Sequence, residues 1–426
     1  MINIKYTQPV SLLGLHAHLP KDVRKLIYAK LDPCEIELIM IAHGSEKHIT
    51  TAFSYYCAKK GYLELLKWIV AEGCLLNSWT CANAARNGHL NVLIWLHGIG
   101  CSINAQVCDC AAQNGHLDVL IWLDSVGCTP DANTFAIAIE NGHLDVLIWL
   151  HSIRGPWAAE DCSGAVHNGH LKVLIWLHEN EYPFSENDCS DAAENGHLDV
   201  LQYLHASGRV WDAWTCTYAA KNGHLGVLKY LHANGCPWNE DVCAAAAEGG
   251  HFELLKWAHT NGCPWDATTF AHASTNDRLD ILNWLIENEC PWDERPCAYA
   301  AGKGHFKVIK YLRDNGCPWS SYTCTNAAKS GHFELLKWLR ANGCPWDVTT
   351  FAYAADQGHL DVLKWLYTNG CPWDARACDY ACDNSQIQVL EWLISIGCPF
   401  NKMKYIRAAI EDNNQRVLDW LMIINH

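Results

Sequence analysis

Apolar residues recur along the chain with the spacing of short helices. Between His224 and Asn234, for example, leucine or valine occupies positions 225, 227, 228 and 231, which lie on one face of a helix. A shorter alanine-rich segment before it closes at Asn222-Gly223, and Gly235 and Pro237 follow it, so each segment ends at a helix-stop signal. No stretch alternates with period two beyond a few residues, so strands are not expected. The pattern predicts an all-α fold built from helix–turn–helix repeats.

The turn inside each repeat carries a glycine or its equivalent, and these positions keep a step of 27 residues without insertion. They are Gly61, Gly88, Gly115, Gly142, Gly169, Gly196, Gly223, Gly250, Asp277, Gly304, Gly331, Gly358 and Ser385, and a last repeat with one extra residue follows at Asp412 and Asn413. About 14 repeats at a fixed period indicate a stacked array, in which each repeat buries its apolar face only against its neighbours. Such an array accommodates 426 residues without dividing them among several compact domains.

The repeat resembles the ankyrin repeat. Ala219-Ala220 and Asn222-Gly223-His224-Leu225 stand where that family has its A-A-x-N-G-H-L stretch, and Cys216 stands where it has the leucine of T-P-L-H. The resemblance implies an ankyrin-like helical repeat solenoid of about 14 helix–turn–helix units, covering residues 45–426. It also implies a scaffold whose surface binds another protein.

The loop between repeats is shorter than in the ankyrin family. The stretch from Gly316 to Ala327 is six residues shorter than in an ankyrin unit of about 33 residues, and the missing residues fall in the β-hairpin finger. We expect Trp238 and its equivalents to fill the core position that a valine holds in longer units. Repeats of this length with C-P-W-D loops also resemble the large ankyrin families of giant DNA viruses of amoebae.

The first 44 residues differ from the repeats. Leu19-Pro20-Lys21-Asp22-Val23, followed by Leu26, Ile27 and Leu31, predicts an apolar helix opened by proline, and residues 36–43 predict a second helix. Every solenoid requires a terminal cap, so residues 1–44 are interpreted as a helical cap. The same pattern resembles the first helix of an F-box, which docks on a Skp-type adaptor of a cullin ubiquitin ligase. Both interpretations, a cap alone and a truncated F-box-like element, stay open.

Most of the 23 cysteines fall into two columns, one per repeat position. The loop column comprises Cys74, Cys101, Cys128, Cys236, Cys263, Cys290, Cys317, Cys344, Cys371 and Cys398. The helix column comprises Cys81, Cys108, Cys162, Cys189, Cys216, Cys243, Cys297, Cys324 and Cys378. Neighbours within a column sit one repeat apart, about 8–10 Å for packed helices, whereas a disulfide needs Cα atoms within about 7 Å. Buried free thiols imply a reducing compartment, so we expect a cytoplasmic protein, in the host cytoplasm if it is viral.

The charge and the apolar runs restrict the partners. A formal net charge of −15 argues against nucleic acid, because an acidic surface repels a phosphate backbone. No apolar run reaches the roughly 18 residues needed to cross a bilayer, and residues 1–22 lack the regions of a secretory signal. We therefore expect neither secretion nor insertion into a membrane.

Catalytic and metal-binding patterns are not found. Histidine follows the turn glycine in ten repeats, but successive histidines lie a full repeat apart, too far to share an ion held by bonds of about 2 Å. No nucleophile elbow, phosphate-binding glycine loop or H-E-x-x-H motif occurs. We expect no enzyme activity, no metal and no cofactor.

One column in the second helix predicts an exposed apolar stripe. With the core direction at Val146, Leu147 and Leu150, position 148 points roughly 150° away from the core, at about 100° per residue. Later repeats place lysine at this position, whereas four adjacent early repeats place isoleucine: Ile94, Ile121, Ile148 and Ile175. A contiguous apolar stripe indicates an interface, including one for self-association, and tolerated surface isoleucine is the alternative.

A column in the first helix changes from repeat to repeat while its frame stays constant. Its candidate partner-binding residues are Tyr218, His272, Tyr299, Asn326, Tyr353 and Tyr380. A variable position on a fixed scaffold is typical of a recognition surface, and tyrosines are good interface anchors. Drift at an unconstrained position is the alternative.

The leading hypothesis is a scaffold that binds a protein partner through the solenoid surface. A substrate receptor of a cullin ubiquitin ligase is the second hypothesis, with residues 1–44 on the adaptor and the repeats on the target. A structural or assembly protein of a virus, using the isoleucine stripe for self-contact, is the third.

Overall fold

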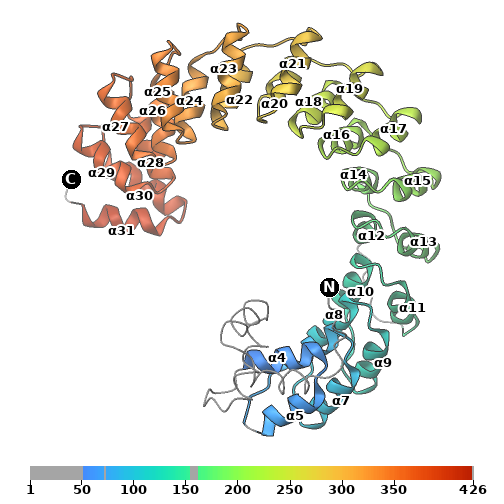
Figure 1. Ribbon diagram of the computed structural model, residues 1–426. Coiled ribbons are helices and arrows are strands. Elements are labelled where there is room, and N and C mark those ends of the chain that lie inside the picture. Colours follow the sequence, from blue (N-terminus) through green and yellow to red (C-terminus); the bar gives the residue numbers. More distant parts are fainter. Residues whose placement is uncertain (1–50, 72, 154–161, 425–426) are drawn as a thin grey trace, which may run out of the picture. The chain divides into compact units, whose positions relative to one another are not determined.

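The computed structural model describes residues 51–71, 73–153 and 162–424. Over these residues the protein contains 28 α-helices and no β-strand, so the predicted all-α fold is confirmed. The helices follow one another in pairs, each pair with an even-numbered first helix and an odd-numbered second helix (Figure 1). The predicted cap at residues 1–44, with its F-box-like alternative, lies outside the described residues.

The chain divides into two compact parts, an N-terminal region (Met1–Asp188) and a C-terminal region (Cys189–His426). The described helices of the N-terminal region are α4 (Thr51–Lys60), α5 (Leu63–Ala71), α6 (Ser78–Arg86), α7 (Leu90–Gly98), α8 (Ala105–Gln113), α9 (Leu117–Ser125), α10 (Ala132–Glu140), α11 (Leu144–Ser152), α12 (Ser163–His167) and α13 (Leu171–Glu179).

Helix α14 begins at the boundary. The helices from there on are α14 (Asp188–Glu194), α15 (Leu198–Ala206), α16 (Ala213–Lys221), α17 (Leu225–Ala233), α18 (Glu240–Glu248), α19 (Phe252–Thr260), α20 (Ala267–Ala273), α21 (Leu279–Glu287), α22 (Arg295–Gly302), α23 (Phe306–Asp314), α24 (Ser321–Lys329), α25 (Phe333–Ala341), α26 (Val348–Asp356), α27 (Leu360–Thr368), α28 (Arg376–Asp383), α29 (Ile387–Ser395), α30 (Lys402–Glu411) and α31 (Gln415–Ile423).

Each repeat buries the same set of small and aliphatic side chains between its helices. In the repeat of α10 and α11, Ala138 of the first helix and Val146, Leu147 and Leu150 of the second helix are fully buried, as the pattern predicts. Burying one valine or leucine side chain is worth about 1.5–3 kcal/mol. A helix of nine residues is marginal by itself, so packing against neighbouring helices holds each one in place.

The turn between the two helices of a repeat is fixed by a glycine and by a histidine of the next repeat. Gly88 has a φ of 71°, which favours glycine, and a Cβ added there would lie 2.7 Å from the His116 ring. Nε2 of His116 lies 3.1 Å from the carbonyl oxygen of Arg86. Because a carbonyl only accepts, the imidazole donates from Nε2. This contact, called here the histidine staple, joins each turn to the preceding one.

The staple recurs along both regions with the same separation of 30 residues between the histidine and the carbonyl. It is formed by His89, His116, His143, His170, His224, His251, His305, His332 and His359. Gln386 occupies the same place and its Nε2 donates to the Asp356 carbonyl at 3.4 Å. The histidine column is therefore a structural element of the turn.

The repeat at α20 and α21 departs from this scheme. Asp277 was expected to be the turn position, but it lies in a bend and does not have the positive φ of the turn glycines. The Asn276 side-chain amide instead donates to the carbonyl oxygens of Ala247 and Glu248, at 3.0 and 2.7 Å. An asparagine amide thus takes the place of the histidine staple onto the preceding turn, and Asp277, without a positive φ, does not need to be glycine.

The acidic residue at the end of several loops caps the next first helix. Asp347 precedes α26, where its carboxylate accepts from the backbone while Thr350 hydrogen-bonds back to the Asp347 backbone N–H. Asp131 before α10 and Asp212 before α16 form the same capping box with the threonine three residues on. Such a cap is worth about 0.5–2 kcal/mol, and it gives the D-x-x-T spacing of the repeat its physical reason.

The loop tryptophans do not fill the core, so that prediction was wrong. Trp265 is partly exposed, and its ring stacks on His259 with a centroid separation of 3.6 Å and meets Trp284 edge-on at 5.5 Å. Cys263, two residues earlier, is the loop side chain that faces the core. Because the thiol already occupies the space there, the larger ring lies along the second helices.

Candidate protein-binding surface

The residues of the predicted recognition column lie on first helices of the C-terminal region. They are Tyr218 on α16, His272 on α20, Tyr299 on α22, Asn326 on α24, Tyr353 on α26 and Tyr380 on α28. Neighbouring first helices from α16 to α28 pack directly on one another. The equivalent residue of α18, Ala245, is buried. The structure therefore brings His272 to Tyr380 together on successive helices and separates Tyr218 from them by one repeat.

Ring contacts hold the column in place before any partner arrives. The Tyr353 and Tyr380 rings are 5.6 Å apart, and the His272 and Tyr299 rings meet edge-on at 5.8 Å. The Lys329 ammonium lies 5.1 Å from the centre of the Tyr353 ring. Partly exposed rings that are already ordered lose little side-chain freedom when they bind, which favours their use as anchors.

Asn326 is partly exposed and also has a structural contact. Its Nδ2 donates to the carbonyl oxygen of Ala298 at 3.0 Å, which joins α24 to α22. This residue is therefore less available for a partner than the tyrosines on either side of it.

A second column of exposed aromatic residues was missed by the sequence analysis. Trp214 and Tyr322 open α16 and α24, and 58% and 65% of their surfaces are exposed. Each lies four residues before a member of the recognition column, so both residues share one helix face. The Trp214 and Tyr218 rings lie 6.2 Å apart. The four-residue step from the variable column was the sequence signal that could have revealed them.

The charge of this surface changes along its length. Near α18, the Glu248 carboxylate lies 3.6 Å from the Lys221 ammonium and 3.9 Å from Nδ1 of His272. Both contacts are at exposed side chains, so each adds little to stability. Their effect is to balance the charge at the start of the His272–Tyr380 segment.

The other end of the segment is acidic. Burial and the nearby Asp379 and Asp412 carboxylates raise the pKa of Asp383, and Asp356 acts in the same direction. Lys404 forms an ion pair with Asp379, and Asn384 donates to Asp356 at 2.6 Å. Several carboxylates close enough to disfavour one another's charge would be relieved by a cationic group. This end suits a lysine or arginine side chain.

The isoleucine stripe lies on second helices of the N-terminal region. Ile94 on α7, Ile121 on α9 and Ile148 on α11 are 48%, 48% and 49% exposed. Ile175 on α13 is only partly exposed. Three of the four predicted residues are thus exposed as predicted, and the apolar face weakens at α13. Lysines Lys229, Lys310 and Lys364 are exposed at the same position of the C-terminal region.

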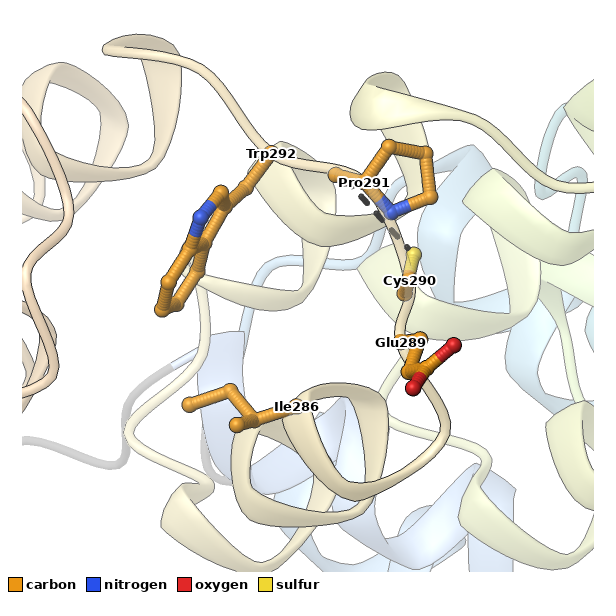
Figure 2. A pocket seen from close by; sticks show the side chains of 5 residues that line it. All are labelled: Ile286, Glu289, Cys290, Pro291 and Trp292. Carbon is orange, nitrogen blue, oxygen red and sulfur yellow. Dashed lines mark hydrogen bonds between the residues drawn. The ribbon is translucent and has the colours of Figure 1, made fainter.

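An open pocket of about 350 Å³ lies beside the loop tryptophan that follows α21. Figure 2 shows the Trp292 ring and the Ile286 side chain on one side of it, with Pro291 and Cys290 on the other. In the preceding repeat, His259 stacks on the loop tryptophan, whereas Ile286 stands at the same position here. Trp292 instead meets Phe270 edge-on at 4.8 Å. The pocket results from this local change in packing and collects no set of polar groups.

The geometry offers no site for a metal ion within the described residues. No group of three or more histidine, cysteine, aspartate or glutamate side chains converges there. Most of the described cysteines are buried free thiols. Burial raises the pKa of Cys290 and of Cys371 to about 12, so these two thiols stay protonated near neutral pH.

Comparisons with known proteins agree with the observed fold. Residues 325–404 match the family model described as ankyrin repeats (3 copies), and residues 189–232 match the model described as ankyrin repeats (many copies). The search of curated proteins gave no match. The matched segments are thus similar to ankyrin repeats, and the described residues have an ankyrin-like fold of paired helices without a strand.

Two solved structures are similar to this chain. The human ASB11 ankyrin repeat domain is 23% identical over 43% of this chain and 99% of its own, with a TM-score of 0.33. The pentatricopeptide repeat protein PPR10, solved in complex with an 18-nt psaJ RNA element, is 11% identical over 98% of this chain and 77% of its own, with a TM-score of 0.35. At these TM-scores neither similarity carries an argument about partners.

The described helices are short. None of them is long and apolar enough to cross a membrane.

Proposed function

We propose that the protein is an interaction scaffold that binds a protein partner through the first-helix face of its C-terminal region. The observation that carries this proposal is the pair of aromatic columns, Trp214 with Tyr218 and Tyr322 with the His272–Tyr380 segment, on a frame that otherwise repeats. Exposed aromatic rings held by their neighbours are the side chains that most often anchor interfaces.

The chemistry of the surface indicates the kind of partner. The rings suit an apolar or aromatic side chain, and the carboxylates around Asp383 suit a lysine or arginine beside it. The net charge of −15 would speed the approach of a basic partner and weaken that of an acidic one. We therefore propose a polypeptide with mixed basic and apolar side chains. The free thiols support a cytoplasmic location, in the host cytoplasm if the protein is viral.

The test is affinity capture with matched variants of the full chain. Wild type is compared with the double variant Trp214→Ala/Tyr218→Ala and with Tyr367→Ala, which removes a ring of similar exposure from a second helix. Partners that use the proposed face are lost by the double variant and kept by Tyr367→Ala. Partners retained by all three proteins, or lost equally from both variants, would refute this assignment.

Two further functions remain proposals. The role of a ubiquitin-ligase substrate receptor depends on residues 1–44, which lie outside the described residues, and co-purification with a Skp-type adaptor would test it. A structural or assembly role is supported by the exposed isoleucines Ile94, Ile121 and Ile148. For that role, the solution mass of the protein would have to exceed that of a monomer and fall when these residues become polar.

A further inference from the structure

The two cysteine columns meet each other, although members of one column are a repeat apart. In four repeats, the thiol of a helix cysteine lies close to the thiol of the loop cysteine 20 residues later, with the second helix between them in the chain. The Sγ–Sγ separations are 3.2 Å for Cys81–Cys101, 3.5 Å for Cys108–Cys128, 3.1 Å for Cys216–Cys236 and 2.7 Å for Cys378–Cys398. Sulfurs this close need to approach by no more than about 1.5 Å to reach the bonding distance of about 2.05 Å.

The two cysteine pairs of the N-terminal region differ from the other two in the solvent exposure of the loop cysteine. Cys101 and Cys128 are partly exposed, whereas Cys236 and Cys398 are buried. The next residue is Ser102 or Thr129 in the first two, and proline in the others. The helix partners Cys81 and Cys108 are fully buried. Each N-terminal pair thus consists of one accessible thiol and one protected thiol.

The hydrogen bond between the two thiols affects them in opposite ways, so the loop cysteine and the helix cysteine suit different roles. The Cys81 thiol donates to Sγ of Cys101. This hydrogen bond lowers the pKa of Cys101 and raises that of Cys81. The same direction holds for Cys128, whose pKa the Cys108 thiol lowers. A partly exposed cysteine with a lowered pKa is the one that reacts, and a buried neutral neighbour is placed to resolve the product.

We propose that Cys81–Cys101 and Cys108–Cys128 are two oxidisable dithiol sites that react with low-molecular-weight disulfides. The Cys101 thiolate attacks one sulfur of the small disulfide, which forms a mixed disulfide and releases one small thiolate. Sγ of Cys81 then loses its proton to that thiolate and attacks Sγ of Cys101, which breaks the mixed disulfide and releases the second small molecule as a thiolate that takes a proton from water. The protein loses two electrons and two protons, and the small disulfide becomes two thiols.

Oxidation would restrain two of the four helices that carry the isoleucine stripe, α7 and α9. The segment from Cys81 to Cys101 encloses the whole of α7 with Ile94, and the segment from Cys108 to Cys128 encloses the whole of α9 with Ile121. A bond across each pair fixes the loop end of the second helix to the core of the first helix. The oxidised N-terminal region is therefore the more resistant to local opening.

The decisive measurement uses the reduced, full-length wild-type protein with glutathione disulfide as the probe. Samples taken over time are alkylated, digested, and the four linked peptide pairs are quantified by mass spectrometry. We expect the 81–101 and 108–128 disulfides to form at least about tenfold faster than 216–236 and 378–398, because only their loop thiols are accessible. Equal rates at all four pairs, or a stable glutathione adduct on Cys101, would overturn the proposal.

Variants separate the two roles, with the Cys216–Cys236 pair as the matched control. In Cys81→Ser, Cys101 is expected to stop at the glutathione adduct, and in Cys101→Ser, Cys81 is expected to stay unmodified. Cys236→Ser should leave the rate of the 81–101 bond unchanged. An adduct on Cys81 in place of Cys101 contradicts the assignment. If a serine variant does not fold, the wild-type rates still decide the question.

Discussion

The N-terminal and C-terminal regions share the same turns, helix caps and core, called here the frame, but expose different side chains. His143 and His332 form the same staple, at 3.1 and 3.2 Å, and Asp131 and Asp347 form the same capping box. Outside the frame the regions diverge. Three adjacent second helices expose isoleucine in the N-terminal region, several second helices expose lysine in the C-terminal region, and the C-P-W loops belong to the C-terminal region.

This difference shows which positions the array leaves free. A repeat contacts only its neighbours, so residues that form the turn, the cap and the core must recur, whereas residues that point outward face no such demand. The outward columns are thus the positions at which the surfaces of the two regions differ. The predictions below test how independent the frame and the surfaces are.

The largest effect is expected in the core and should be equal in the two regions. Leu147 and Leu363 occupy the same repeat position and are both fully buried. Replacement of either by alanine should cost about 2–5 kcal/mol, since a cavity replaces the side chain. Urea unfolding measures the loss, and hydrogen exchange should locate it in the adjoining repeats. Trp265→Ala, at a partly exposed ring, is the control with the smaller cost. A much larger loss for one leucine would mean that the frames are not equivalent.

The histidine staple should also contribute equally in both regions. His143→Ala and His332→Ala each remove the hydrogen bond to a carbonyl, that of Gln113 or Gly302, together with the packing of the ring on the preceding turn, at a cost of about 1–2 kcal/mol. The chain supplies its own control, because Gln386 fills the same role. Thermal unfolding should show that His332→Gln retains more stability than His332→Ala. Identical melting curves for the two would argue against the hydrogen bond.

The caps give a smaller effect that depends on pH. Burial by itself raises the pKa of Asp347, but hydrogen bonds from Thr349 and Thr350 outweigh it and hold the pKa below its usual value. The contribution of this carboxylate is therefore present above the unfolded pKa of about 3.9 and is lost as the pH falls through the folded pKa. Asp347→Ala should cost about 0.5–2 kcal/mol at neutral pH, and less in acid. Unfolding measured from pH 7 to pH 3 checks this, and a constant difference between variant and wild type would contradict it.

Exchange of the outward residues should change stability least. Ile94, Ile121, Ile148 and Ile175 replaced together by lysine should shift stability by no more than about 0.5 kcal/mol per exposed site, because the C-terminal region already carries lysine there. Self-association or partner binding through the stripe should weaken. The reverse change of Lys229, Lys310 and Lys364 to isoleucine should add association. Light scattering of both variants tests this, and an unchanged solution mass and partner set in the first variant would remove the stripe as an interface.

The sequence by itself determined the helices, the period and the turns. Each depends on residues close together in the chain, such as the glycine of the turn, the proline after the second helix and the apolar spacing within nine residues. Local physics fixes these features, so one repeat is enough to recognise them. The exposure of most of the isoleucine stripe followed from the same helical geometry, whereas recognition of a partner by the first-helix column stays a prediction.

Only the tertiary structure decided which side chains meet across repeats. The thiols of Cys81 and Cys101 lie 20 residues apart with a helix between them, and no spacing rule within one column brings them together. Whether Trp265 or Cys263 enters the core likewise depends on the space left by neighbouring helices. Which side chain is buried at these points depends on the volume that the neighbouring repeats leave unfilled, and that volume is defined only when the repeats are stacked.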